Sequence, residues 1–289
     1  MPAPVTPVIV TFNSAAVLGA CLASLRGETL APVVIDNASD DASAELAAEL
    51  GARVHINARN EGFGRAMNSG AALADSEFLL LVNPDLTFDP GAIAALLKAA
   101  RDYPGASLFG PRLIEPDGRV FFPDQSLLSP QRRKSRAAEA LPAGDCTQPF
   151  LSGACYLVRR AAFLALGGFD PNIFLFYEDD DLCRRFADAG SPPVYVHGAV
   201  ARHARGKSSA PAKGRQFKAR WHLAWSRIYV ARKYGARPHS PRLLCKSGAK
   251  YLLAAAMCDS ARRERHGGTI AGVIAALLGK GALRKENLE

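Results

Sequence analysis

The sequence predicts an α/β fold in which a parallel sheet is covered by helices on both faces. Three observations carry this prediction. Short apolar segments of strand length alternate with longer segments whose apolar residues recur at helical spacing. Polar residues follow the ends of several apolar segments, where ligands bind in such sheets. The chain has 289 residues, 48% hydrophobic and 22% charged, so it can bury a sizeable core without disulfides.

The first part of the chain alternates strands and helices. Residues 5–12 are expected to form a buried strand, and a helix follows from about Ser14, a residue type that favours the N-cap position. Further strands are expected at residues 32–35, 52–57, 78–82 and 106–113, and further helices at 41–50, 63–74 and 90–101. This alternation predicts parallel strands with helical connections.

The second part of the chain begins with a change of character at residues 123–149. This stretch carries four prolines and the basic run 131–136, and it predicts a mobile loop inserted into the domain. Whether the loop covers a site, touches an anionic acceptor or is a plain connection is left open. Beyond it, helices are expected at 160–166 and from 178, a strand at 193–201, and basic helices from about Pro211.

The net charge of +9 hides an asymmetry between an acidic body and a basic tail. Residues 1–200 hold 16 Lys and Arg against 23 Asp and Glu, whereas residues 201–289 hold 20 against 4. Such a tail predicts an anionic partner (a membrane surface, nucleic acid or a phosphorylated substrate) or else a solvated helical surface. Leu252, Leu253 and Met257 precede a cluster of arginines, so this stretch either lies on a membrane or packs on the body.

Cysteine usage and the chain's start predict a cytoplasmic protein. The six cysteines form no CxxC pair or zinc-like spacing, which is typical of a reducing compartment. No signal peptide is recognised near residues 8–10, and the longest uncharged apolar run, 269–279, is too short to span a bilayer. Peripheral association with the inner face of the membrane is therefore the membrane hypothesis that remains.

Several residues at the expected strand ends could carry chemistry. Asp85 closes the Asn-Pro-Asp sequence after the strand 78–82, where a carboxylate is well placed to hold Mg²⁺ or Mn²⁺ beside phosphate oxygens. His203 follows a strand and stands among three cations, a setting that suits a diphosphate or its metal. The run 178–181 places four carboxylates in sequence, of which one or two can face a common target as a general base. The alternative is that this run has no catalytic role and is simply a set of acidic residues at a helix N-terminus, where the helix dipole favours negative charge.

With these pieces in order, the chain resembles inverting glycosyltransferases of family 2, and within that family bacterial rhamnosyltransferases acting on lipid-linked glycans. The matching stretches are VIVTFNS (8–14), VIDNASDDAS (34–43), NEGFGRAMNSG (60–70), LLLVNPDL (79–86), FLSGACYLVRR (150–160), GGFDPNIFLFYEDDDLCRRFADAG (167–190) and HARGKSS (203–209). The resemblance implies the GT-A fold, a Rossmann-like mixed sheet with helices on both faces. It divides the chain into a transferase domain at 1–210 and a basic helical region at 211–289.

The resemblance also implies roles for individual residues. Those expected to contact the base, ribose, diphosphate or sugar of the donor are Thr11, Asn13, Asp36, Asn60, Gly62, Arg65, Asn68 and Asn83, with Asp40 nearby. Asn83 stands where the family has the first Asp of its DxD motif, so metal binding is expected to rest on Asp85 and His203. Asp179, the second residue of the family's ED pair, is the expected base, ahead of Glu178 and Asp181.

These roles imply a metal-dependent hexosyltransferase of cell-wall or polysaccharide biosynthesis. dTDP-rhamnose is the first expectation for the donor and a UDP-sugar the second; the acceptor is a glycan or a polyprenyl-diphosphate-linked sugar. Three other functions stay open. The first is a nucleotidyltransferase, although the chain lacks the Gly-rich signature of that class after its first strand. The others are an inactive transferase used as a scaffold and a nucleic-acid-binding protein, a function that would leave the acidic body unexplained. The oligomeric state, including a homo-oligomer, is also open.

Overall fold

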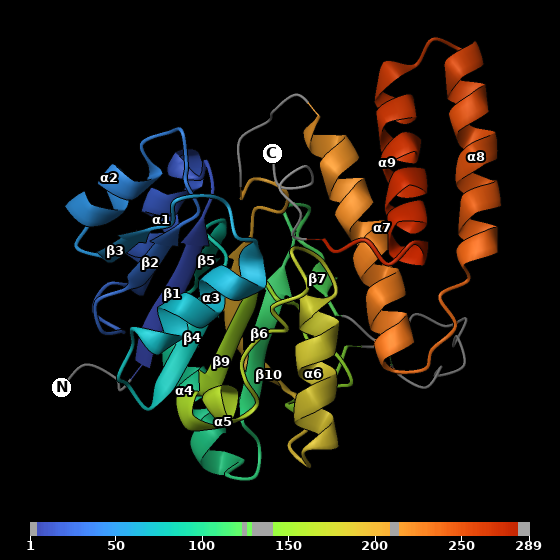
Figure 1. The fold of residues 1–289 in the computed structure, drawn as a ribbon. Helices are drawn as coiled ribbons and strands as arrows, with labels where there is room; N and C mark the ends of the chain where they lie inside the picture. The colour runs from blue at the N-terminus through green and yellow to red at the C-terminus, as the bar shows by residue number, and fades with distance from the viewer. Residues whose placement is uncertain (1–4, 123–125, 129–140, 209–213, 283–289) are drawn as a thin grey trace.

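The computed structural model describes residues 5–122, 126–128, 141–208 and 214–282 (Figure 1). Within them one sheet of ten strands has the order β3-β2-β1-β4-β9-β6-β10-β5, with β7 beside β6 and β8 beside β10. The strands are β1 (Val5–Thr11), β2 (Val33–Asp36), β3 (Arg53–Ile56), β4 (Phe78–Val82), β5 (Leu86–Phe88), β6 (Leu108–Ile114), β7 (Val120–Phe121), β8 (Cys146–Thr147), β9 (Cys155–Arg159) and β10 (Val194–His203).

The sheet is mixed, as the family resemblance implies, whereas strand and helix alternation alone predicts a parallel one. β3, β2, β1 and β4 are parallel neighbours. β9 then pairs antiparallel with both β4 and β6, and β5 pairs antiparallel with β10. The short strands β5, β7 and β8 and the inserted strand β9 are not among the expected elements. Two or three residues are too few to show alternation, and β9 runs directly into a helix without a turn signal.

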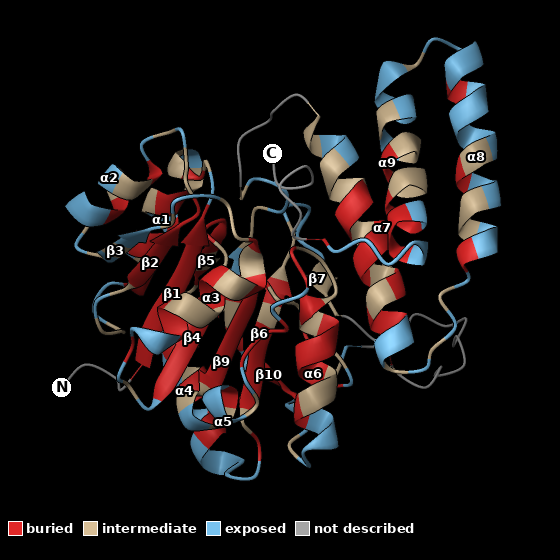
Figure 2. Cartoon of the chain, in the orientation of Figure 1, coloured by how far each residue is buried: buried red, intermediate tan, exposed pale blue. Residues whose placement is uncertain are grey.

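Helices cover both faces of this sheet, which agrees with the prediction. The helices of the described residues are α1 (Ala15–Leu25), α2 (Ser43–Glu49), α3 (Phe63–Ala72), α4 (Ala92–Asp102), α5 (Arg160–Ala165), α6 (Glu178–Asp188), α7 (Arg215–Lys233), α8 (Ser240–Ala256) and α9 (Ser260–Leu277), and the first six of them pack on the sheet. One apolar cluster joins α1, α2 and α4 to the sheet, and a second joins α3, α5 and α6 to its other face. Figure 2 shows the resulting core, in which the central strands are buried along their length.

The last three helices form a layer beside the body of the protein. α7 contacts the body through a stack of Phe174 on His222, with ring centroids 4.4 Å apart, and through Trp225 and Ile228. α9 packs closely on α7, because a Cβ at Gly272 would stand 2.2 Å from the Trp221 carbonyl oxygen. α8 lies outermost and exposes most of its length (Figure 2). Among the described residues, no helix combines the length and apolar character needed to cross a bilayer.

Two details of the predicted loop and helix start can be compared with the structure. Residues 123–125 and 129–140 of the expected loop lie outside the described residues. Of its other residues, Leu128 is buried and Cys146–Thr147 forms β8. Ser14 precedes α1 as predicted, but its hydroxyl makes no capping bond to the helix. It donates instead to the Ser208 carbonyl oxygen at 2.5 Å, which ties the start of α1 to the segment after β10.

Candidate active site

A cleft with a volume of about 430 Å³ opens where the carboxyl ends of β1, β2 and β4 meet the start of α6. Six of the predicted site residues line it: Asn60, Gly62, Asn83, Glu178, Asp179 and His203. They come from segments distributed over more than 140 positions of the sequence. The sheet edge brings them together because parallel strands end on one side, as the sequence pattern predicts.

Thr11, Asn13 and Asp36 lie beneath the cleft rather than in its lining. The buried Asp36 carboxylate accepts hydrogen bonds from Thr11 Oγ1 at 2.7 Å and from Ser39 Oγ at 2.6 Å. Asn13 Oδ1 accepts from the Asp40 backbone N–H at 2.7 Å. These bonds fix the turns after β1 and β2, and the groups that reach the cleft from these turns are the neighbours Phe12 and Asn37.

Phe12 is therefore a functional candidate that the sequence reasoning missed, and Asn37 is a polar residue at a strand end to which it assigned no role. Phe12 is 36% exposed in the cleft, and an exposed aromatic ring offers a stacking surface for a nucleotide base. Asn37 is buried, accepts from Asn57 Nδ2 at 2.8 Å and donates through Nδ2 to the Gly62 carbonyl oxygen at 3.2 Å. The available signal was position alone, since Phe12 ends the predicted strand 5–12 and Asn37 lies two residues beyond the predicted strand 32–35.

Gly62 is required by a close approach of two backbone segments. Its φ is +88°, a region that L side chains rarely adopt, and a Cβ there would lie 2.5 Å from the Phe174 carbonyl oxygen. The same oxygen accepts from the Phe63 N–H at 3.0 Å, and Gly62 N donates to Asn60 Oδ1 at 2.9 Å. The turn into α3 thus forms one wall of the cleft against the segment before α6.

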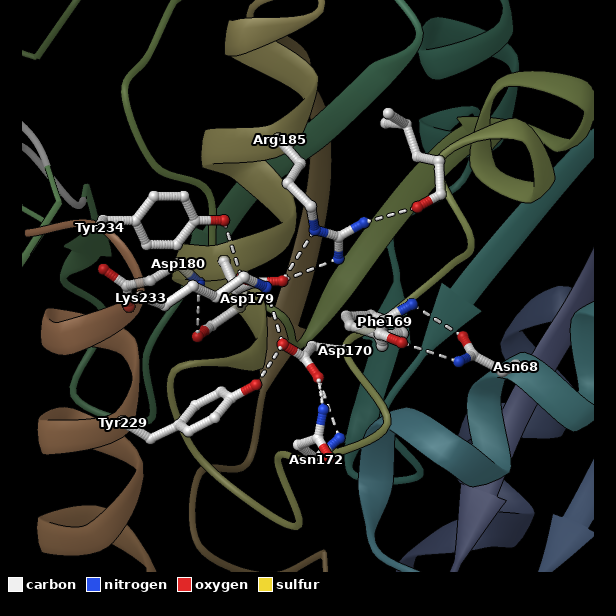
Figure 3. Close-up of polar contacts among 12 residues, drawn as sticks. Asn68, Phe169, Asp170, Asn172, Asp179, Asp180, Arg185, Tyr229, Lys233 and Tyr234 are labelled. Carbon is white, nitrogen blue, oxygen red and sulfur yellow. Dashed lines mark hydrogen bonds and ion pairs between the residues drawn. The ribbon is translucent and has the colours of Figure 1, made fainter. Parts of the chain in front are cut away.

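Arg65 and Asn68 do not line the cleft, in contrast to the roles predicted for them. Arg65 Nε donates to the Pro171 carbonyl oxygen at 2.7 Å. The Asn68 amide pairs with the Phe169 backbone, accepting from its N–H at 2.8 Å and donating to its carbonyl at 2.9 Å (Figure 3). Both side chains hold the segment that leads to Phe174, so their contribution to the site is to position it.

Asp85 and His203 come together as the predicted metal pair. Asp85 is buried, and neither of its carboxylate oxygens has a hydrogen-bond partner among the described residues. His203 Nε2 stands 3.5 Å from Asp85 Oδ1. Burial acts to raise the pKa of Asp85, but the contacts with His203 and Ser208 outweigh it and hold the pKa below its usual value. A buried, ionised carboxylate with unfilled hydrogen-bonding positions is costly, so this donor pair fits a divalent cation.

The pair is supported from behind by Glu115, which the sequence analysis did not single out. Its Oε1 lies 4.0 Å from His203 Nδ1, and its Oε2 accepts from Arg205 Nη1 at 3.1 Å. A carboxylate on the far side of an imidazole commonly orients a metal-binding histidine. Within the described part of the chain no group of three His, Cys, Asp or Glu side chains converges, so further ligands would have to be diphosphate oxygens and water.

Asp179 has the properties of a general base. Its carboxylate lines the cleft and accepts from the N–H of Gly153 at 3.2 Å and from that of Asp180 at 3.0 Å. Removal from water, followed by the negative charge of Asp180, raises its pKa to about 7. A carboxyl group with a pKa near neutrality can both take and keep a proton under working conditions. The adjacent Glu178 is buried, and its pKa is raised well above the usual value by burial and then by Asp179.

The other two carboxylates of the run are structural. Asp180 accepts from Ser126 Oγ and, at 3.2 Å, from the Leu127 N–H, which holds the segment 126–128. Asp181, a lesser candidate for the base, is fully buried in ion pairs away from the cleft. The acidic run therefore divides between the reaction site and the packing of the fold.

Asp181 belongs to a network that joins α6 to α7 (Figure 3). Lys233 Nζ lies 2.5 Å from Asp181 Oδ1 and 2.7 Å from Asp170 Oδ2. Arg185 Nε donates to Asp181 Oδ2 at 2.8 Å, and Tyr234 donates to its Oδ1 at 2.8 Å. Figure 3 shows Tyr229, Lys233 and Tyr234 reaching from α7 and its end toward the α6 side. At its other end α7 brings Arg215 into the lining of the cleft, so the basic region is part of the site.

The family model for glycosyl transferase family 2 matches residues 6–167. Over 238 residues, the chain is 33% identical to the N-acetylglucosaminyl-diphospho-decaprenol L-rhamnosyltransferase of Mycobacterium tuberculosis; the match covers 71% of this chain and 78% of the relative. It is 24% identical over 204 residues to the rhamnosyltransferase WbbL of Escherichia coli, covering 60% of this chain and 71% of the relative.

The fold is shared with solved enzymes of low sequence identity. One is the mannosyltransferase PcManGT from Pyrobaculum calidifontis, in complex with GDP-Man and Mn²⁺. The TM-score is 0.59 at 18% identity, and the match covers 97% of this chain and 90% of that one. The alignment thus extends over nearly the whole length, including the C-terminal helices.

Proposed function

Because the chain belongs to glycosyl transferase family 2, we propose that it is an inverting, metal-dependent hexosyltransferase that moves a sugar from a nucleotide sugar to an acceptor hydroxyl. The observation that carries this proposal is the pairing of two opposed chemistries in one cleft. Asp179 lines the cleft and has a pKa of about 7, which suits proton removal. His203 lines the same cleft and lies 3.5 Å from the buried carboxylate of Asp85, and these two residues would bind the cation. A single displacement needs these two functions on either side of the reacting carbon.

In the proposed reaction, Asp179 takes the proton from the acceptor hydroxyl as that oxygen attacks the anomeric carbon. The bond from the anomeric carbon to the diphosphate oxygen breaks, and its electron pair leaves with the nucleoside diphosphate. Attack from the face opposite the leaving group inverts the anomeric configuration. Mg²⁺ or Mn²⁺ bound at Asp85 and His203 would neutralise charge developing on the diphosphate.

For the donor we propose dTDP-rhamnose, with a UDP-sugar as the alternative. The support is that relatives of the chain are named rhamnosyltransferases. Phe12 and Asn37 would contact the base, with the networks of Thr11, Asn13 and Asp36 holding them in place. For the acceptor we propose a polyprenyl-diphosphate-linked glycan of the cell surface, in line with the lipid-linked acceptor in the mycobacterial relative's name.

We further propose that the catalytic unit is the body at 1–210 and that the helical region at 211–289 completes it. Support comes from Arg215 in the cleft and from the ion pairs of Lys233 with Asp170 and Asp181. An enzyme with a lipid-linked acceptor works at a membrane surface, which we propose to be the cytoplasmic face of the inner membrane.

The test is a thermal-shift panel of dTDP-, UDP- and GDP-sugars, each with and without Mg²⁺ or Mn²⁺. Donor at about 100 times its Kd stabilises the folded state by about 2.7 kcal/mol. We expect one nucleotide class to raise the Tm, with the metal required. Asp85→Asn should remove this shift, whereas Asp89→Asn, which affects an exposed ion pair with Arg202, should keep it. A metal-independent shift in both variants would contradict the metal pair.

Product analysis tests the rest of the proposal. With the donor found in the panel and a short-chain polyprenyl-diphosphate sugar, proton NMR should show a product of inverted anomeric configuration. Retention of configuration, or donor binding without any transfer in the presence of metal and acceptor, would contradict the mechanism. The second outcome would favour the inactive-scaffold alternative.

A further inference from the structure

A second cavity lies outside the cleft, among the three C-terminal helices, and carries an unusual charge. It has a volume of about 540 Å³. Five cationic or titratable side chains line it: Arg220, Lys250, Arg262, Arg265 and His266. They come from α7, α8 and α9, so the tertiary packing of these helices builds the cluster.

The positive charge of this cavity is not balanced within the described residues. Arg262 pairs with Asp259 at 3.3 Å, but Arg220, Lys250 and Arg265 take part in no ion pair with a described carboxylate. Desolvation and the neighbouring cations lower the pKa of His266, and desolvation with Arg265 lowers that of Arg220. Like charges gathered without a counter-charge destabilise the fold, and a bound anion relieves that repulsion.

An exposed apolar surface adjoins the cavity at the α8–α9 turn. Leu252, Leu253 and Met257 are 70%, 59% and 60% exposed, and Leu253 also lines the cavity. Ala249 and Ala256 of α8 are also exposed and, at helical spacing, lie on the same side of the helix as Leu252. These large apolar side chains are exposed beside cations that have no ion-pair partner among the described residues. Such a surface is typical of one that binds an amphipathic partner.

The cavity and the cleft each have a lining residue in the first turns of α7. Figure 1 shows the α8–α9 turn standing at the end where α7 begins. Arg215 of α7 lines the cleft, and Arg220, five residues later or about 7.5 Å along the helix axis, lines the cationic cavity. A planar surface that meets the α8–α9 turn would therefore also lie at the end of α7 that contributes Arg215 to the cleft.

We propose that this cavity binds the phosphate headgroup of an anionic membrane lipid while Leu252, Leu253 and Met257 insert among the acyl chains. The combination of charges and apolar surface decides between anionic partners. Nucleic acid would satisfy the cations but offers no apolar phase to the leucines and the methionine, whereas a lipid surface satisfies both. The biological purpose of this lipid site depends on the proposed function, in which the acceptor is lipid-linked. Its binding chemistry does not, because the site recognises the membrane itself and takes no part in sugar transfer.

The experiment is co-sedimentation of the full chain with phosphatidylcholine vesicles, with and without phosphatidylglycerol. We expect binding only to the anionic vesicles and release as the ionic strength rises to about 0.5 M. Lys250→Gln with Arg265→Gln should weaken binding about 25-fold, since each cation near an anionic surface contributes about five-fold. Leu252→Ser with Met257→Ser should weaken it about ten-fold or more. The matched control, Arg237→Gln with Arg242→Gln, changes the same charge at the far end of α8 and should bind like the wild type.

Three outcomes would overturn the proposal. The first is equal binding of the cavity and control variants, and the second is displacement from vesicles by inorganic phosphate at millimolar concentration. The third is a wild-type protein that does not bind vesicles and instead either binds a DNA duplex or self-associates, with Leu252→Ser abolishing the self-association. The metal-dependent thermal shift by donor, measured on the same variants, should stay unchanged. If the wild-type protein shows no metal-dependent thermal shift with any donor, that result would contradict the proposed function but not the lipid site.

Discussion

Replacing the proposed base should make the protein more stable while abolishing its activity. In the folded protein the pKa of Asp179 is about 7, against 3.8 for an ordinary aspartate exposed to water. Between these pH values the folded protein holds a proton that the unfolded chain has released. The stability of the wild type therefore falls as the pH rises through this window, and the cost of the ionised carboxylate is fully present above pH about 7.

The size of the effect follows from the pKa shift. Each pKa unit corresponds to about 1.4 kcal/mol, so the shift of Asp179 sets an upper limit of about 4 kcal/mol. Because Asp179 lines an open cleft, solvent screens part of this cost, and we expect about 2 kcal/mol. Asp179→Asn should then raise the free energy of unfolding by about 2 kcal/mol at pH 8, or the Tm by roughly 4–8 °C. The gain should shrink as the pH falls toward 4 and vanish near pH 3, below both pKa values, where the wild-type carboxyl is protonated in the folded and the unfolded state.

The assay is urea unfolding of both proteins at several pH values, with sugar transfer measured alongside. Loss of a general base lowers kcat by about 100-fold or more. The matched control is Asp188→Asn, which removes an exposed carboxylate on the same helix, paired with Arg184, and should alter neither quantity by much. A variant that is destabilised at pH 8, or that gains the same stability at pH 4 and pH 8, would refute the reasoning. Retained transfer would show that another group takes the proton.

Three further predictions concern the supports of the site. Lys233→Met should lower the free energy of unfolding by about 3 kcal/mol in urea, because it leaves the buried carboxylates of Asp170 and Asp181 without their shared cation; an unchanged midpoint would contradict this. Gly62→Ala should lower the Tm and weaken donor binding in calorimetry, because its Cβ would collide with the Phe174 carbonyl oxygen; wild-type affinity would show that the two segments separate easily. Chelation of divalent cations should remove the donor-induced thermal shift, and Mn²⁺ should restore it; a shift that persists in chelator would argue against the cation pair.

The fold could be predicted largely because its signals are local. Strands such as 78–82 are continuous apolar runs, and the polar residues after them mark the functional edge of the sheet. β9 escaped prediction because its insertion between β4 and β6 depends on pairing with strands far away in sequence. For the same reason the basic tail could not be assigned: its charge is visible in the sequence, whereas the close packing of α7 on α9 is not.

The site was predicted at the level of segments rather than side chains. Asp85 and His203 meet as expected, but Asn68 bonds a backbone segment 101 residues away, a contact that only the folded chain reveals. Thr11 and Asp36 satisfy each other below the cleft, so the residues beside them reach the ligand space. A motif thus identifies which turn forms the site, while hydrogen bonding within that turn decides which of its side chains remain available.

The acidic run at the start of α6 shows why a costly local sequence is retained. Asp179 has a raised pKa, so its ionised form lowers the stability of the fold, and the neighbouring Glu178, whose pKa is also raised, lowers it further. The next two residues act in the opposite sense, since Asp180 holds the segment 126–128 and Asp181 ties α6 to Lys233 of α7. Asp179, the proposed base, therefore stands on a helix that its immediate neighbours hold in place, and this keeps its carboxylate at the cleft. Such a conflict between local stability and global placement is expected where a residue is kept for reaction chemistry rather than for folding.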